Sequence, residues 1–146
     1  MTTLTLNPTQ DTFYWNGVGN IPDRNYGVRT DLFVGENGDS QPGRILIKPD
    51  LSSLPSTAII SSAVLSLWLE TNGGATTRTL RVFRCKRAWT EGTGDNTIPD
   101  DGATWNKYDG TNAWETGGGF GANDCEQTDI GSLSITSAHR PERIWI

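Results

Sequence analysis

The chain has 146 residues, of which 34% are hydrophobic and 20% charged, and its net charge is -5 at pH 7. This length suits a single domain with a sizeable core over residues 1–146. The negative balance leaves no basic stripe for a phosphate backbone, so we expect no nucleic-acid partner. No apolar run approaches the roughly 20 residues that span a bilayer, so we also expect no membrane insertion.

Short strand patterns separated by turn formers fill the first third of the chain. Leu4–Leu6 alternates and is then stopped by Asn7-Pro8, which predicts one short strand before a second. Proline cannot donate a hydrogen bond to a sheet, so Pro49 is expected to end a strand. The further strands predicted here are Thr12–Trp15, Leu32–Gly35 and Arg44–Lys48.

The clearest strand pattern runs from Ile59 to Glu70. Its period of two places one set of residues on a core face, namely Ala63, Leu65, Leu67 and Leu69. The opposite face carries Ser62, Val64, Ser66 and Trp68. Turn residues 72–74 then lead into the alternating stretch Thr79–Cys85, which predicts an antiparallel hairpin between the two stretches.

A long stretch rich in Gly, Asp, Asn and Thr lies between Thr90 and Thr128 and is interrupted by aromatic residues. Loops of this length are uncommon in compact domains, so we expect it to be functional or held down by its rings. Trp89 and Trp105 bracket its first part and are expected to be packed. Strand alternation resumes at Ile130–Ile135, and Arg143–Ile146 is a further strand candidate. The prediction is an all-β fold: an antiparallel, jelly-roll-like β-sandwich with long Gly/Asp-rich loops.

Several short motifs, taken in order, resemble DNRLRE-type domains over about Asp11 to Ile135. These motifs are Asn25-Tyr26-Gly27, Asp50-Leu51-Ser52-Ser53-Leu54-Pro55, Ile60-Ser61-Ser62-Ala63-Val64-Leu65, Trp89-Thr90-Glu91-Gly92 and Thr104-Trp105. The resemblance implies a β-sandwich related to carbohydrate-binding modules, of a kind found in bacterial surface and secreted proteins and in phage proteins. Such domains continue beyond the equivalent of Ile135 into closing strands, so the chain is either truncated or completed by a strand from a neighbouring subunit.

Loop aromatics are the candidate ligand-binding residues. Sugar rings have apolar C–H faces that stack on aromatic rings, and hydroxyls that bond to Asp, Asn and Arg. The candidates are Trp15, Tyr26, Tyr108 and Trp114. The alternative is that these rings plug the ends of the sandwich.

Carboxylates of the long loop are candidate ligands for Ca²⁺, which takes six to eight oxygen ligands. They are Asp95, Asp100, Asp101, Asp109, Asp124 and Glu126. None follows an EF-hand pattern, and solvated loop carboxylates are the alternative. Cys85 and Cys125 are compatible with one disulfide or with two reduced, buried thiols.

The function predicted is non-catalytic binding or adhesion to a polysaccharide or cell-surface glycan. No motif fixes a pair of acids for glycoside hydrolysis, and His139 is the only histidine, so no enzyme is expected. The alternative is a structural protein, such as a phage virion decoration or fibre component or a surface filament subunit, with a homo-oligomer or a virion or filament neighbour as partner. Both functions imply an extracellular, cell-surface or virion location, although Met1–Leu4 begins no signal peptide on this chain.

Overall fold

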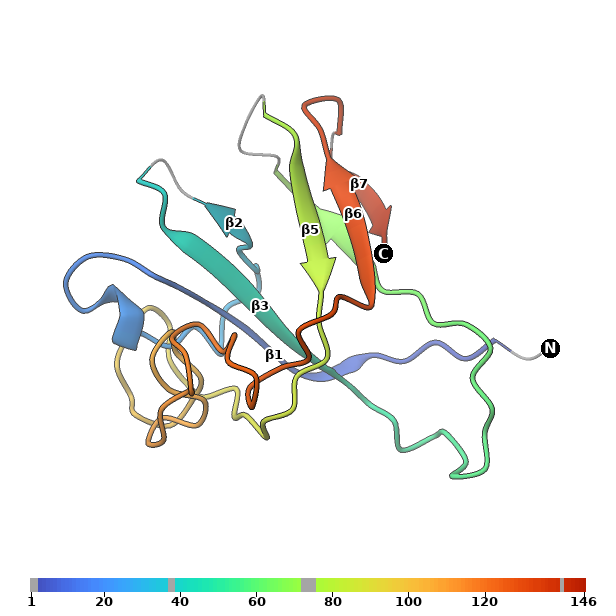
Figure 1. The fold of residues 1–146 in the computed structure, drawn as a ribbon, viewed down its shortest axis with the longest axis horizontal. Helices are drawn as coiled ribbons and strands as arrows, with labels where there is room; N and C mark the ends of the chain where they lie inside the picture. The colour runs from blue at the N-terminus through green and yellow to red at the C-terminus, as the bar shows by residue number, and fades with distance from the viewer. Residues whose placement is uncertain (1–2, 37–38, 72–75, 140) are drawn as a thin grey trace. The chain divides into compact units, whose positions relative to one another are not determined.

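The computed structural model describes residues 3–36, 39–71, 76–139 and 141–146, and its regular secondary structure is almost entirely β-strand, joined by long irregular segments (Figure 1). Its elements are β1 (Pro8–Trp15), η1 (Ile21–Asp23), β2 (Gly35–Glu36), β3 (Pro42–Pro49), β4 (Ser66–Leu69), β5 (Arg78–Val82), β6 (Gly131–Ile135) and β7 (Glu142–Trp145). Every strand pairing is antiparallel, and the one helical element in the described ranges is the three-residue 3-10 helix η1. The all-β, antiparallel fold class is confirmed.

Contacts divide the chain into two compact units. The first comprises residues 1–56 and 85–125, and the second comprises residues 57–84 and 126–146. Each unit is therefore built from two separate stretches of the chain. The expectation of one domain over residues 1–146 stays a prediction.

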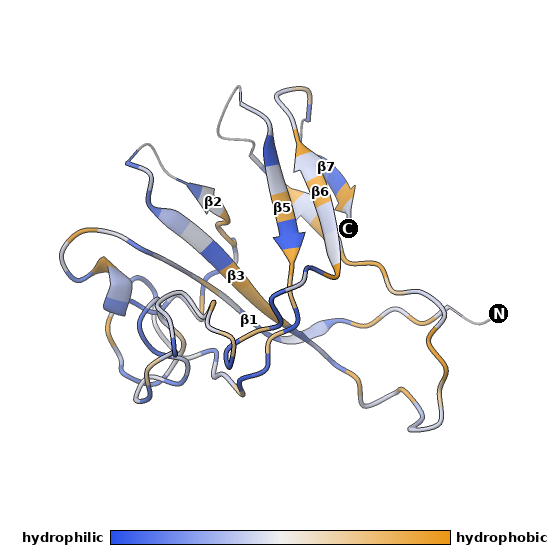
Figure 2. Cartoon of the chain, in the orientation of Figure 1, coloured by the Kyte–Doolittle hydropathy of each residue, from blue (hydrophilic) through white to orange (hydrophobic). Residues whose placement is uncertain are grey.

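The first unit contains a three-stranded sheet in the order β1-β3-β2. Phe13 of β1 lies opposite Ile45 of β3, within the apolar run that Figure 2 shows as the orange stretch of β3. The predicted short strand at Leu4–Leu6 is absent. Pro8, which was expected to end that strand, is instead the first residue of β1. A first strand residue is a position that proline tolerates. β3 ends at Pro49, as predicted.

The core of the first unit joins β1 to the long loop. Tyr14, Trp89, Ala103 and Trp114 form a buried cluster. Partly buried side chains pack around it, namely Leu46, Cys85, Trp105 and Tyr108. The irregular stretch from residue 86 to 124 is thus held down by its rings, and Trp89 and Trp105 are packed as expected.

The side chain of Asn25 fixes the start of this loop through hydrogen bonds to backbone groups. Its side chain is fully buried, and its Nδ2 donates to the carbonyl oxygens of Glu91 (2.7 Å) and Ala103 (2.9 Å). Its Oδ1 accepts from the backbone N–H groups of Gly27 (3.0 Å) and Gly94 (2.7 Å). All four hydrogen-bonding positions of the amide are used, which explains the Asn25-Tyr26-Gly27 motif structurally.

The second unit contains two two-stranded sheets, β4-β7 and β5-β6 (Figure 1). The predicted hairpin between residues 59–70 and 79–85 is wrong, because β4 pairs with β7 and β5 pairs with β6. The predicted strand at 59–70 is also too long: it is reduced to Ser66–Leu69, and Ile59 is exposed. The turn expected at 72–74 lies outside the described residues. The strands predicted near Ile130–Ile135 and Arg143–Ile146 are present as β6 and β7.

Candidate functional site

Tyr26 is packed inside the first unit together with Trp15. The Tyr26 ring is only 5% exposed and stacks on Phe13 with a centroid separation of 4.4 Å. Its hydroxyl accepts a hydrogen bond from Trp15 Nε1 (2.8 Å) and donates one to Asn96 Oδ1 (2.9 Å). The ring of Trp15 is half-buried and meets Phe33 edge-on. The interpretation of Tyr26 as an exposed loop ring is corrected by its burial.

Trp114 is likewise a core residue. It is 5% exposed, and its Nε1 donates to the carbonyl oxygen of Thr104 (2.9 Å). Tyr108 is half-buried beside it, with ring centroids 5.6 Å apart, and the Arg87 guanidinium lies 5.3 Å from the centre of the Tyr108 ring. A sugar would reach Trp114 only if neighbouring rings moved, so its interpretation as an exposed platform is also corrected.

The six carboxylates expected to bind calcium lie in separate interactions. Four form ion pairs, which are Asp95–Arg29, Asp100–Lys107, Glu126–Arg84 and Asp124–Arg87. Asp101 accepts from the hydroxyl (2.6 Å) and the backbone N–H (3.0 Å) of Thr93, and these bonds lower the pKa of its carboxyl. Asp109 accepts from the backbone N–H groups of Asn112 and Thr111, which lower its pKa in the same way.

Asp124 is fully buried and organises the end of the long loop. It accepts from the backbone N–H groups of Glu115, Thr116 and Gly121, each at 3.1 Å, and from Arg87 Nε at 3.1 Å. Burial raises the pKa of this carboxyl, but the backbone N–H groups and the Arg87 guanidinium lower it by more, so the net pKa lies below the ordinary value. Its oxygens are thus occupied by donors of the protein.

No group of three His, Cys, Asp or Glu side chains is arranged to hold a metal ion within the described parts of the chain. The structure therefore does not gather the predicted calcium ligands into one site. Calcium binding stays a prediction without geometric support.

Two exposed tryptophans, which the site prediction missed, lie on the β4-β7 sheet. Trp68 is 64% exposed and Trp145 is 58% exposed. In the register, Trp68 faces Arg143 and Ser66 faces Trp145, so these four side chains share one face of the sheet. We call this face the Trp68–Trp145 platform.

The register also brings the platform side chains close together. Leu65 and Ile146 exchange both backbone hydrogen bonds, each 2.9 Å long. The next pair, Ser66 and Trp145, is therefore a non-hydrogen-bonded pair, and so is the pair of Trp68 with Arg143 two positions further on. Side chains approach most closely in such pairs, and diagonal neighbours such as Trp68 and Trp145 lie about 7 to 8 Å apart.

Arg143 lies among the platform residues and is held there. Its guanidinium is 5.8 Å from the centre of the Trp145 ring, and its Nη1 donates to Ser66 Oγ (3.2 Å). The opposite face of the sheet carries the buried Ile144 and the half-buried Leu67 and Leu69, with the exposed Glu142 at its end. Because that face supplies the packing, the two tryptophans are left on the solvent side.

The sequence contained part of this signal. The alternation of residues 59–70 places Ser66 and Trp68 away from the core face, and Arg143–Ile146 is a strand candidate in the sequence. The missing information was the pairing of the two strands, which are distant in the chain. Only that pairing places Trp145 beside Trp68.

A second group of rings, the half-buried Trp105 and the exposed Phe120, is already covered by a protein side chain. The guanidinium of Arg44 lies 4.9 Å from the centre of the Trp105 ring and 5.0 Å from that of Phe120. Arg44 also donates to the carbonyl oxygen of Gly118. This arrangement stabilises the loop but leaves less free ring surface than the Trp68–Trp145 platform.

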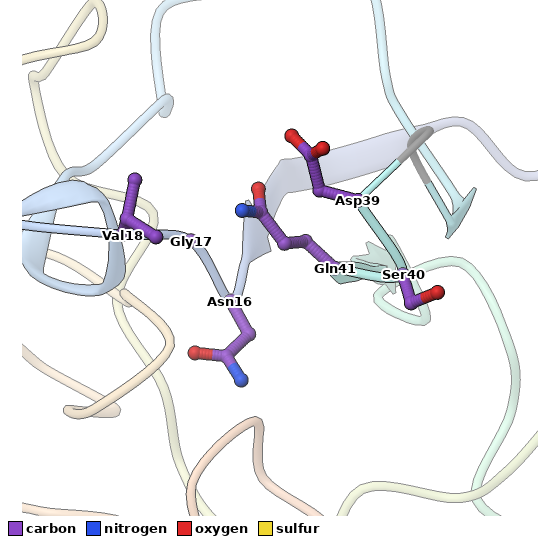
Figure 3. A pocket seen from close by; sticks show the side chains of 6 residues that line it. All are labelled: Asn16, Gly17, Val18, Asp39, Ser40 and Gln41. Atoms are coloured by element: carbon purple, nitrogen blue, oxygen red, sulfur yellow. The ribbon is translucent and has the colours of Figure 1, made fainter.

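A hollow of about 320 Å³ lies between the end of β1 and the start of β3 (Figure 3). Its described lining is Asn16, Gly17, Val18, Asp39, Ser40 and Gln41. None of these six is aromatic, so they offer hydrogen bonds but no stacking surface. The hollow is therefore a weaker candidate for sugar binding than the platform.

An antiparallel β fold that presents aromatic rings on a solvent face has the construction of a carbohydrate-binding module. Residues 2–115 match the model of Carbohydrate-binding module family 96, and the chain belongs to this family. Modules of this kind bind carbohydrate and are not themselves catalytic. Neither the curated proteins nor the solved structures searched contain a match.

The family finding supports only part of the resemblance described above. It establishes the relation to carbohydrate-binding modules, whereas the DNRLRE-type assignment stays a prediction. The match includes Trp68 but ends before β6 and β7, so Trp145 lies outside the matched residues. No helix in the described ranges has the length and apolarity needed to cross a membrane.

Proposed function

We propose that the chain is a non-catalytic module that binds polysaccharide or cell-surface glycan on the Trp68–Trp145 platform, in an extracellular, cell-surface or virion setting. The observation that carries this proposal is the pair of largely exposed tryptophans on one face of β4-β7. Exposed apolar surface of this kind on a soluble protein commonly marks a binding site. Membership of the family makes carbohydrate the expected ligand class.

The chemistry of the platform suits a sugar chain. Indole faces offer flat apolar surface to the C–H faces of pyranose rings, and each indole N–H can bond to a hydroxyl. One N–H group of Arg143 donates a hydrogen bond to Ser66. A guanidinium has five N–H donors, so others are available to ligand oxygens. Two rings on diagonal positions offer stacking to neighbouring sugars of one chain, which favours a polymer over a free monosaccharide.

The platform lacks the groups that would hydrolyse a glycan. Glycoside hydrolysis uses two carboxyl groups roughly 5 to 10 Å apart across the scissile bond. Within β4 and β7 the only carboxylate is Glu142, which pairs with Leu69 and so belongs to the opposite face. This placement supports binding without catalysis.

The test is binding to a panel of immobilised polysaccharides, with added Ca²⁺ and again with a chelator. We expect saturable binding to one glycan class, weakened by Trp68→Ala or Trp145→Ala by about 1 to 3 kcal/mol each, the magnitude of a lost aromatic anchor. Trp68→Phe keeps an aromatic face and should retain most of the affinity. Loss of binding on chelation would revive the calcium hypothesis.

Ile59→Ala is a matched control, because Ile59 is 97% exposed and outside the platform. It should bind like the unaltered protein. If the wild-type protein binds a glycan and both tryptophan variants bind it equally well, the platform is not the site.

An assembly role is the second candidate, favoured by the open edges of the two-stranded sheets. Within the described residues, β4 and β7 pair only with each other, as do β5 and β6. Unpaired edges are templates for strands of another chain, whether in a homo-oligomer or in a virion or filament. A concentration-independent monomer in light scattering would count against this role, and a symmetric oligomer would favour it.

A further inference from the structure

Cys85 and Cys125 face each other across an isolated antiparallel bridge at the base of the long loop. Both are thiols in the structure. Lys86 N–H donates to the Asp124 carbonyl (2.8 Å), and Glu126 N–H donates to the Arg84 carbonyl (2.9 Å). These bonds join the residues next to the cysteines, so the cysteines themselves form a non-hydrogen-bonded pair.

That register brings the two side chains within bonding reach. The Cα atoms of a non-hydrogen-bonded antiparallel pair are about 4.5 Å apart. Disulfides span Cα separations of about 4.4 to 6.8 Å. The Sγ atom of Cys85 also lies 3.6 Å from the carbonyl oxygen of Asp124, the residue that precedes Cys125.

We propose that Cys85 and Cys125 are a thiol pair that small-molecule disulfides such as oxidised glutathione convert into a cross-strand disulfide, closing the loop 86–124 at its base. The sequence left a disulfide and two reduced thiols as equal alternatives. The bridge geometry makes them two oxidation states of one site. This inference does not depend on glycan binding.

The reaction is a two-step thiol–disulfide exchange. The Cys85 thiolate attacks one sulfur of oxidised glutathione, which forms a mixed disulfide and releases one glutathione thiolate. The Cys125 thiolate then attacks the Cys85 sulfur and releases the second glutathione. The protein gives up two thiol protons and two electrons, and one glutathione disulfide becomes two glutathione thiols.

Exposure and protonation determine the order and the pH dependence of these steps. Cys85 is half-buried whereas Cys125 is 5% exposed, so Cys85 is the more accessible first nucleophile. Burial raises the pKa of both thiols. The thiolate is the reactive form, so the exchange should accelerate as the pH is raised above neutrality.

The closed link should stabilise the protein, because it restricts the unfolded chain over the whole 86–124 segment. For a loop of this length we expect a rise in Tm of about 10 °C. The loop contains Trp89, Trp105 and Trp114, so oxidation would tighten the core of the first unit.

The experiment treats the full chain with oxidised glutathione at mildly alkaline pH. We expect titratable thiols to fall from two to none, the intact mass to fall by two hydrogens, and peptide mapping to join Cys85 to Cys125. Tm should rise and return to its initial value after a reductant is added. Cys125→Ser is the matched control: it keeps the more accessible Cys85 and should take up one glutathione without any comparable rise in Tm.

Three outcomes would overturn the proposal. They are retention of both thiols in the folded wild-type protein, uptake of glutathione on the cysteines without an intramolecular link, and a link between two chains instead of within one. Each is read on the wild-type protein, so the result does not rely on a variant that fails to fold.

Discussion

Tryptophan has opposite roles in the long loop and on the β4-β7 sheet. In the loop, Trp114 is 5% exposed and is surrounded by other rings, and its N–H bonds to a backbone carbonyl. On the sheet, Trp68 and Trp145 are more than half exposed. The packing is done by Leu67, Leu69 and Ile144 on the opposite face. A tryptophan in the polar loop is thus a structural anchor here, whereas the tryptophans of β4 and β7 are the ones available to a ligand.

The largest effect that tests this contrast is expected at Trp114. Trp114→Ala should lower the free energy of unfolding by about 3 to 5 kcal/mol, because it leaves a cavity in a buried aromatic cluster. Urea unfolding followed by circular dichroism would measure the loss. Glycan affinity per folded molecule should stay unchanged, and a stable Trp114→Ala protein that no longer binds glycan would reverse the assigned roles.

A smaller loss of stability is expected at Asp124. Asp124→Asn removes a charge that accepts hydrogen bonds from three backbone N–H groups and Arg87, so it should cost about 2 kcal/mol. The pKa of Asp124 is lower in the folded state than its ordinary value. Its contribution is therefore complete above the unfolded pKa of about 3.9 and is lost as the pH falls through the folded pKa.

The pH dependence gives this prediction its control. The difference in unfolding free energy between wild type and Asp124→Asn should be constant from neutral pH down to about pH 5 and should shrink below about pH 4. A difference that stays constant down to the lowest accessible pH would show that the charge of Asp124 contributes nothing to stability.

The smallest effect is expected at Arg143 on the platform. Arg143→Gln removes a cation near the Trp145 ring and several donors, so glycan affinity should fall by about 0.5 to 1 kcal/mol, or two- to five-fold. Stability should change by less than about 0.5 kcal/mol, because the side chain is on the exposed face. Isothermal titration with the bound polysaccharide measures the change. An affinity loss as large as that of Trp68→Ala would make the cation, and not the rings, the main contact.

Local pattern was enough to predict most strands but not their partners. Alternation identified Thr12–Trp15 inside β1, Arg44–Lys48 inside β3 and Ile130–Ile135 around β6. The predicted hairpin was wrong because each of its strands has a partner far along the chain, and hydrophobic alternation is the same for any partner. Pairing over such distances depends on tertiary packing.

The candidate site was harder to predict for the same reason. A tryptophan among Gly and Asp residues has the same local sequence whether it is exposed or buried. Trp114 is buried because it packs beside Tyr14 of β1, which lies 100 positions earlier in the chain. The centroids of the two rings are 6.1 Å apart. Trp68 could be placed on the outer face of its strand from the sequence, but its diagonal neighbour Trp145 could not be placed beside it.

The pairing of Ser66 with Trp145 also has a consequence for the nascent chain. Residue 145 leaves the ribosome roughly 4 to 16 s after residue 66, at synthesis rates of about 5 to 20 residues per second. During that interval β4 has no partner in its sheet, and its leucines and Trp68 are unprotected. Strands in this state are prone to aggregation, so the yield of folded protein in cells should be sensitive to chaperone supply and to growth temperature.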